Sequence, residues 1–221
     1  MPDELAIREE YVRQEARKII DGIKDPAHDW AHTVRVKVDS LTIGETIGAD
    51  PMETKLIVWG HDIGYGEQLS THGETRHEDF SAVLYEPILK RAGYGNDLIQ
   101  RVLYGIRNHT YSICPNPTSP ELMAVQDADR IDTIGIIGIF RAAAYSTFLK
   151  RELFDQEDPF AIKRERDSEA YALDDILLRS DKIIEKLHTL KGKEIFARRL
   201  EFMRDTIEIL RLALGPYIHA T

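Results

Sequence analysis

Histidine and acidic side chains gather in the first half of this 221-residue chain, where together they could bind a metal ion. Six of the eight histidines precede residue 110. Neutral imidazole and carboxylate groups are good ligands for Mn, Fe, Co, Ni and Zn, whereas Mg prefers oxygen. A divalent-metal site is therefore the chemistry that these residues suggest first.

The adjacent residues His61 and Asp62 lie between an apolar run and the dipeptide Ile63-Gly64. Neighbouring residues on a helix point about 100° apart, so both can reach one ion only where the helix ends. The glycines around the pair favour such an end. The alternative is a buried, hydrogen-bonded His–Asp pair that fixes a turn.

Two further histidines, His28 and His32, have a spacing of one helical turn with Asp29 between them, a pattern also typical of zinc peptidases. Because Pro26 lies just upstream, His28 could precede the helix. We expect His32 to bind the ion, while His28 and Asp29 orient it. Simple turn capping is the alternative role for His28.

Three carboxylates, Asp127, Asp129 and Asp132, follow an apolar run within about one and a half helical turns. Asp129 and Asp132 share a helix face. Acids so close to an apolar run need a cation, which either Arg130 or a metal ion could supply. A solvated acidic face with an Arg130 salt bridge is the other interpretation.

The order of these segments resembles the HD-domain superfamily of metal-dependent phosphohydrolases. The flanking residues strengthen the resemblance, and they read HDWAHTVRV at 28–36, WGHDIG at 59–64 and VQDADRID at 125–132. The segment IRNH at 106–109 also occurs in compact single-domain members. The match is close over residues 26–150 and looser through the C-terminal part.

The resemblance implies one divalent ion (Mn, Mg, Fe, Co or Ni), bound by His32, His61, Asp62 and Asp129. It also implies hydrolysis of phosphate esters or anhydrides, with nucleotides as the expected substrates. The metal would lower the pKa of a bound water and polarise a phosphoryl oxygen. Asp62 or Glu78 would act as the catalytic carboxylate that positions or deprotonates this water.

The basic residues expected to bind substrate phosphate are Arg35, Arg107 and Arg130, although each could instead form a structural salt bridge. His77 and His109 lie where some family members carry ligands for a second metal ion. A second ion is therefore one prediction. The others are phosphate binding by His109 and a supporting role, without direct ligation, for His77.

Helical patterns dominate the chain and predict an all-α fold, an HD-domain helical bundle with additional C-terminal helices. Apolar residues at a 3.6-residue period predict helices at about 3–22 and 28–48. The next helix is expected to start with Asp50 as N-cap, Pro51 at its first position and Glu53 closing a capping box. It would end at the glycine before the His-Asp pair.

The sequence predicts three more helix starts in the middle of the chain. Thr75 with Glu78 predicts the first of these starts, and Asn96 is expected to cap the second. Ser119 and Pro120 then open the helix that carries the acidic segment.

The chain changes character after residue 150. Residues 151–166 are charged and lack periodicity, which predicts a loop, either a plain connector or a lid. Two long amphipathic helices are expected at about 167–190 and 193–213, joined at Lys191-Gly192. They could pack on the bundle or form a homodimer interface.

We expect a single domain over residues 1–221. Its metal-site core would cover about 26–150, and its C-terminal helical portion about 167–213.

Composition limits the class of protein. Hydrophobic residues make up 43% of the chain, enough for a substantial core. No apolar run approaches the roughly 18 residues of a membrane span, and the charged N-terminal segment does not resemble a signal peptide, so a cytoplasmic protein without a membrane partner is expected. A net charge of -9 argues against non-specific binding of nucleic acid. The single Cys114 excludes an internal disulfide and a thiolate zinc cluster.

The expected partner is a small phosphorylated substrate, with nucleotides favoured, because a compact chain suits a soluble metabolite better than a signalling relay. A catalytically degenerate helical module for ligand binding or scaffolding is one alternative, although none of the four expected ligands is replaced. A zinc-dependent peptidase is the other. It would make His28→Ala as damaging to metal binding as His32→Ala.

Overall fold

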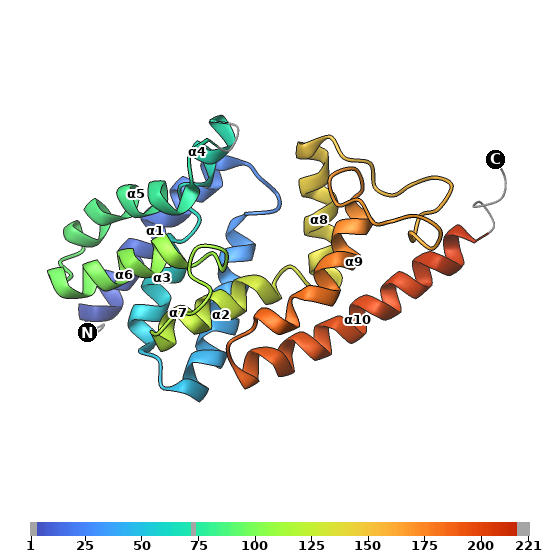
Figure 1. Ribbon diagram of the computed structural model, residues 1–221. Helices are drawn as coiled ribbons and strands as arrows, with labels where there is room; N and C mark the ends of the chain where they lie inside the picture. Colours follow the sequence, from blue (N-terminus) through green and yellow to red (C-terminus); the bar gives the residue numbers. More distant parts are fainter. Residues whose placement is uncertain (1–3, 72–73, 216–221) are drawn as a thin grey trace. The chain divides into compact units, whose positions relative to one another are not determined.

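The structure, a computed structural model, describes residues 4–71 and 74–215 (Figure 1). Over these residues the regular structure is helical, apart from one isolated bridge between Glu152 and Tyr171. The prediction of an all-α fold is confirmed. None of the helices in these ranges is both long enough and apolar enough to cross a membrane.

The chain divides into two compact units, Met1–Ala128 and Asp129–Thr221. Whether the whole chain forms a single domain therefore stays a prediction. The first unit contains these helices: α1 (Glu4–Ile23), α2 (Trp30–Ile47), α3 (Pro51–Gly60), α4 (Tyr65–Ser70), α5 (His77–Arg91), α6 (Asn96–Asn108) and most of α7 (Pro120–Ile131).

Helix α3 is the centre of the first unit. It packs against α1, α2, α5 and α6, and its residues Leu56, Ile57, Val58 and Trp59 are buried. A helix that is apolar on every side is stable only when other elements surround it. The burial of α3 therefore fixes the position of its last residue and of the His-Asp pair that follows.

The start of α3 confirms one prediction and corrects another. Asp50 is the N-cap, and its carboxylate accepts hydrogen bonds from the backbone N–H groups of Met52 and Glu53, each at 2.8 Å. The predicted capping box is wrong, because the Glu53 carboxylate accepts from Arg101 Nε at 2.7 Å instead. The Asp50 backbone N–H donates to Glu121 at 2.8 Å. Residues distant in sequence have replaced the local partner.

The predicted role of Thr75 at the start of α5 is also wrong. The helix begins at His77, with Arg76 at the N-cap position and no side-chain cap from that residue. The backbone N–H of His77 donates to Gln68 Oε1 at 3.1 Å. Since α4 supplies this acceptor, no local capping residue is required.

Helices α6 and α7 begin close to the predicted positions. Asn96 is the first residue of α6 and not its cap, which is Gly95. Ser119 precedes α7, and its hydroxyl accepts a hydrogen bond from the backbone N–H of Leu122 at 3.3 Å.

The second unit contains the end of α7, followed by α8 (Gly135–Leu149), α9 (Ala172–Lys182), the short 3-10 helix η1 (Ile184–Lys186) and α10 (Leu190–Leu214). Helix α8 packs against both α9 and α10. Residues 151–166 contain no helix, as predicted. The loop is tied to α9, because the Asp174 carboxylate accepts from Arg164 Nη2 at 3.0 Å and from the Asp167 N–H at 2.7 Å.

The predicted junction at Lys191-Gly192 is wrong. Both residues belong to the first turn of α10, and the break lies at 183–189 around η1. Thr189 caps α10, with its hydroxyl oxygen accepting from the Gly192 N–H at 2.9 Å. A glycine in a first turn is tolerated when a cap satisfies its N–H group, so it did not mark the end of a helix here.

Candidate metal site

Two groups of histidine and aspartate side chains in the described part of the chain have ligand atoms within 4.8 Å of one another. The first cluster consists of His32, His61 and Asp129, and the second cluster of Asp62, His77 and His109. Both offer imidazole nitrogen and carboxylate oxygen, a donor set that suits a divalent transition metal. Each residue predicted as a metal ligand lies in one cluster or the other.

His61 and His109 are placed by the same device at the ends of two helices. His61 is the C-cap of α3, and its Nδ1 lies 2.7 Å from the carbonyl oxygen of Val58. His109 is the C-cap of α6, and its Nδ1 lies 2.7 Å from the carbonyl oxygen of Ile106. A carbonyl oxygen only accepts, so each Nδ1 carries the proton and donates it. In the neutral rings the lone pair therefore lies on Nε2.

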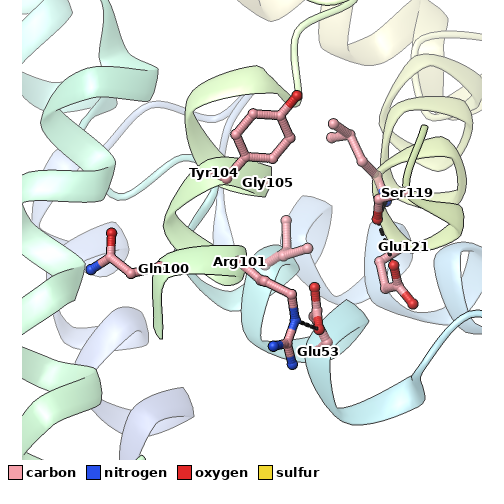
Figure 2. Close-up of a pocket in the computed structure, with 9 residues that line it drawn as sticks. Glu53, Gln100, Arg101, Tyr104, Gly105, Ser119 and Glu121 are labelled. Carbon is pink, nitrogen blue, oxygen red and sulfur yellow. Dashed lines mark hydrogen bonds and ion pairs between the residues drawn. The ribbon is translucent and has the colours of Figure 1, made fainter. Parts of the chain in front are cut away.

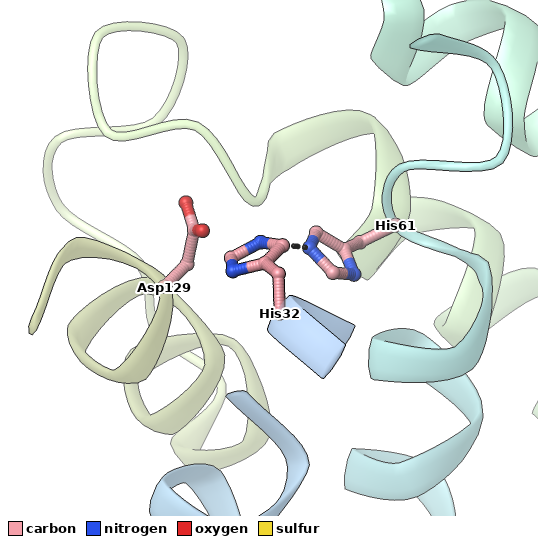
Figure 3. A group of neighbouring side chains, drawn as sticks. All are labelled: His32, His61 and Asp129. Atoms are coloured by element: carbon pink, nitrogen blue, oxygen red, sulfur yellow. Dashed lines mark hydrogen bonds between the residues drawn. The ribbon is translucent and has the colours of Figure 1, made fainter. Parts of the chain in front are cut away.

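The first cluster joins the start of α2 to the end of α3. Asp29 caps α2 and accepts a hydrogen bond from the backbone N–H of His32 at 2.8 Å. The Nε2 atoms of His32 and His61 lie 3.4 Å apart, and both residues are buried. Figure 3 shows His32 between His61 and Asp129. Asp129 lies near the end of α7, directly after the boundary of the first compact unit, and the continuous helix connects it to that unit.

Asp62 belongs to the second cluster and also directs an oxygen toward the histidines of the first cluster. Its Oδ2 is 3.4 Å from His32 Nε2 and 3.2 Å from His61 Nε2. Its Oδ1 is 3.4 Å from His77 Nε2 and 3.7 Å from His109 Nε2. Burial by itself raises the pKa of the Asp62 carboxyl, but the imidazoles of His61, His32 and His77 hold that pKa well below its ordinary value. The ionised form is the one that can act as a ligand.

Gly64 makes the approach of Asp62 to His77 sterically feasible. The turn after α3 passes so close to the start of α5 that a Cβ at Gly64 would lie 2.4 Å from the Ser81 nitrogen and 2.5 Å from the His77 carbonyl oxygen. The Gly64 N–H also donates to Ser81 Oγ at 2.8 Å. Glycine thus fits this position by its size.

The second cluster depends on helix α4, which the sequence did not predict. The Nε2 atoms of His77 and His109 lie 3.2 Å apart. On the other side of its ring, His77 Nδ1 lies 2.8 Å from Gln68 Oε1. The Tyr65 ring, also on α4, contacts His77 edge to face at 5.3 Å between centroids.

Glu78, one of the two predicted catalytic carboxylates, is buried beside the second cluster. It accepts a hydrogen bond from the Thr110 hydroxyl at 2.5 Å, and its other oxygen lies 3.5 Å from His77 Nδ1 and 3.6 Å from Arg76 Nε. Burial raises the pKa of Glu78, but His77 and the Thr110 hydrogen bond outweigh this effect and lower it. Glu78 is therefore ionised at neutral pH.

His28 lies outside both clusters. Its Nδ1 is 2.7 Å from Asp25 Oδ2, and its ring stacks on Tyr65 with 3.9 Å between centroids. The rings of His28 and His32 meet edge to face at 6.0 Å. In the described residues, neither group of three potential metal ligands includes His28, so the peptidase spacing receives no support from the geometry.

The predicted phosphate-binding residues Arg35, Arg107 and Arg130 are all partly accessible. The pKa of the Glu86 carboxyl is lowered mainly by Lys90, and Arg107 lies close enough to contribute a smaller part of this effect. The sequence did not point to Arg76, which is half exposed and donates to the Arg107 carbonyl oxygen at 3.3 Å. Its position directly before His77 was the available signal.

A separate groove of about 460 Å³ is lined by residues of α3, α6 and α7 and by Ser119 (Figure 2). Its lining includes Ile57, Gly105 and Leu122 together with the Glu53–Arg101 ion pair. None of the predicted site residues lines it, so this groove is distinct from the candidate metal site.

Residues 29–134 match the family model of the HD domain, a segment that contains both clusters. This segment of the chain is similar to the HD domain. Within it the motif histidines and aspartates predicted from the sequence come together in space.

The chain is similar to YpgQ of Bacillus subtilis, with 28% identity over 152 residues, which cover 67% of this chain and 71% of YpgQ. The crystal structure of YpgQ in complex with ADP gives a TM-score of 0.72 at 23% identity, covering 97% of this chain and 99% of that one. An HD-superfamily hydrolase from Bacillus thuringiensis gives a TM-score of 0.67 at 22% identity, covering 96% and 98%. The Lin1889 protein from Listeria innocua gives 0.64 at 26% identity, covering 94% and 97%.

Proposed function

We propose that this protein is an HD-domain, metal-dependent phosphohydrolase that binds two divalent ions and acts on nucleotides or related small phosphorylated metabolites. One observation carries the proposal: the Nε2 atoms of His61 and His109 and both oxygens of Asp62 converge between the two clusters. The hydrogen bonds of His61 and His109 to backbone carbonyls leave the lone pairs of their neutral rings on these Nε2 atoms.

Electrostatics favours cations at both clusters. Imidazole nitrogens that face one another at 3.2 and 3.4 Å repel each other if both present lone pairs. A proton or a metal ion between them removes this repulsion. The two clusters together offer six potential ligands, and Asp62 directs one oxygen toward each side, so these residues would hold two divalent ions.

When bound, a divalent ion supplies Lewis-acid stabilisation of the charge on a phosphoryl group. The chain's own residues would orient the substrate and deprotonate the attacking water. Asp62 holds the two clusters together, and the ionised Glu78 is a candidate base because burial and the Thr110 hydrogen bond fix its position. Arg76, at the accessible edge of the second cluster, joins Arg35, Arg107 and Arg130 as a candidate for binding substrate phosphate.

A nucleotide substrate is supported by the likeness to YpgQ, whose crystal structure contains ADP. A net charge of -9 makes a small anionic substrate dependent on local positive charge, which bound metal ions and nearby arginines would provide. The peptidase alternative has less support, because Asp25 and Tyr65 occupy the surroundings of His28.

The proposal is tested by screening nucleoside mono-, di- and triphosphates together with p-nitrophenyl phosphate esters. Mn, Mg, Co and Ni are added separately to protein freed of metal, and bound metal is measured by elemental analysis. We expect turnover with at least one ion and its loss in His61→Ala and Asp129→Ala. The absence of both bound metal and turnover with every ion would support a degenerate binding module instead.

A further inference from the structure

Gln68 on α4 contacts His77 in two places. Its side-chain oxygen accepts a hydrogen bond from the backbone N–H of His77 at 3.1 Å, and it lies 2.8 Å from Nδ1 of the same residue. His77 is part of the second cluster, but Gln68 is not, and no motif in the sequence points to it. One amide group therefore holds both the backbone and the ring of a candidate metal ligand.

The backbone contact determines which way the amide points. A backbone N–H group can only donate, so the Gln68 atom that faces it must be the oxygen. The same oxygen then faces His77 Nδ1, which must donate a proton to it. As a consequence, the lone pair of the neutral ring is on Nε2, the atom that lies 3.4 Å from Asp62 Oδ1 and 3.2 Å from His109 Nε2.

His77 differs in this respect from its neighbours. Backbone carbonyls direct the protons of His61 and His109, and these acceptors remain whatever the side chains are. The nearest acceptor for His77 Nδ1 is a side chain on a six-residue helix, at 2.8 Å, whereas Glu78 Oε2 lies farther away, at 3.5 Å. Without the nearest acceptor, His77 could rotate or carry its proton on Nε2, and either change would remove a ligand atom from the second cluster.

We propose that Gln68 is a positioning residue that directs the Nε2 lone pair of His77 into the second cluster, so that tight binding of the second ion depends on it. This inference rests on the proposed two-ion function. Outer hydrogen-bond partners of metal-binding histidines typically contribute about 10–100-fold to metal affinity, and an effect of that size is expected here.

Three variants test the proposal. Each metal-free protein is titrated with Mn, and calorimetry measures the affinity of each binding step. Gln68→Leu retains the size of the side chain but removes the acceptor, and it should weaken the second binding step by about 10–100-fold while leaving the first unchanged. Gln68→Glu retains an oxygen acceptor and should bind two ions. Gln100→Leu on α6, at the edge of the separate groove, serves as the control and should behave as the wild type.

A second readout reports the position of the proton directly. Two-bond ¹H–¹⁵N correlation spectra of the metal-free protein should show the Nδ1-protonated tautomer of His77 in the wild type and in Gln68→Glu, and its loss in Gln68→Leu. If Gln68→Leu fails to fold by circular dichroism, Gln68→Met supplies the same test. Two tight sites and an unchanged His77 tautomer in the Leu or Met variant would overturn the role of Gln68. A wild type that binds fewer than two ions would instead refute the two-ion proposal.

Discussion

The two clusters differ in how their histidines are held. In the first cluster, His61 is anchored by a backbone carbonyl, and His32 follows the N-cap of α2 in a fully buried position. In the second cluster, His77 relies on the Gln68 side chain, and about 13% of its own side chain is exposed. Backbone anchors at the ends of packed helices cost little to maintain once the fold forms. We therefore expect the first cluster to bind its ion more tightly and the second cluster to release its ion first.

The largest effect should come from the residue that both clusters share. Asp62→Ala removes an oxygen from each cluster and should reduce metal content to less than one ion per chain. Activity should fall by about 10³-fold or more. The lost ions stabilise the transition state by several kcal/mol, and each loss of about 1.4 kcal/mol slows the reaction tenfold. Elemental analysis and initial rates check this, with the exposed Asp97→Ala as control. A variant that kept two tight ions would show that Asp62 is not shared.

Removing one histidine from each cluster should separate them. His61→Ala should lose the first ion and His109→Ala only the second, since these two residues occupy equivalent C-cap positions in different clusters. In competition with a graded series of chelators, the ion that remains in His109→Ala should be the more tightly held. The reverse order of affinities would contradict the difference in anchoring described above.

Gly64→Ala should act on the second cluster alone. A Cβ would collide with the backbone at the start of α5, so the helix must move away and carry His77 from Asp62. We expect lower thermal stability, retention of the first ion and weaker binding of the second. Equal affinities for the second ion in variant and wild type, measured by calorimetry, would mean that the approach at Gly64 does not control the cluster.

The smallest effect is expected for His28→Ala. Its ring supports Tyr65 and pairs with Asp25 but lies outside both clusters, so two ions should remain, with affinities weakened by about tenfold at most. His32→Ala is the matched comparison and should lose the first ion. Equal metal loss in the two variants would support the alternative hypothesis of a zinc-dependent peptidase, in which His28 and His32 both bind the ion.

The sequence predicts those parts of the fold that short-range patterns control. The 3.6-residue periods indicate the all-α class, and Asp50-Pro51 marks the start of α3 because an N-cap and a proline act locally. It fails where the partner is distant in the chain. Glu53 pairs with Arg101 rather than closing a capping box, and the N–H of His77 is capped by Gln68.

The same distinction applies to the candidate site. His32, His61, Asp62 and Asp129 were recognisable because their types and order resemble a family. The residues that orient the site, such as Gln68 and Thr110, have common types and no motif. Only packing brings them to His77 and Glu78, and a single sequence carries no local signal for such contacts.

Anomalous diffraction from crystals of the protein grown or soaked with Mn would locate the two proposed ions directly. We predict two peaks roughly 3.5–4 Å apart, the usual separation in two-metal sites, with Asp62 between them. The peak beside His32, His61 and Asp129 should have the higher occupancy at limiting Mn. A single peak, or one that involves neither cluster, would contradict the proposal that the two clusters form one shared metal centre.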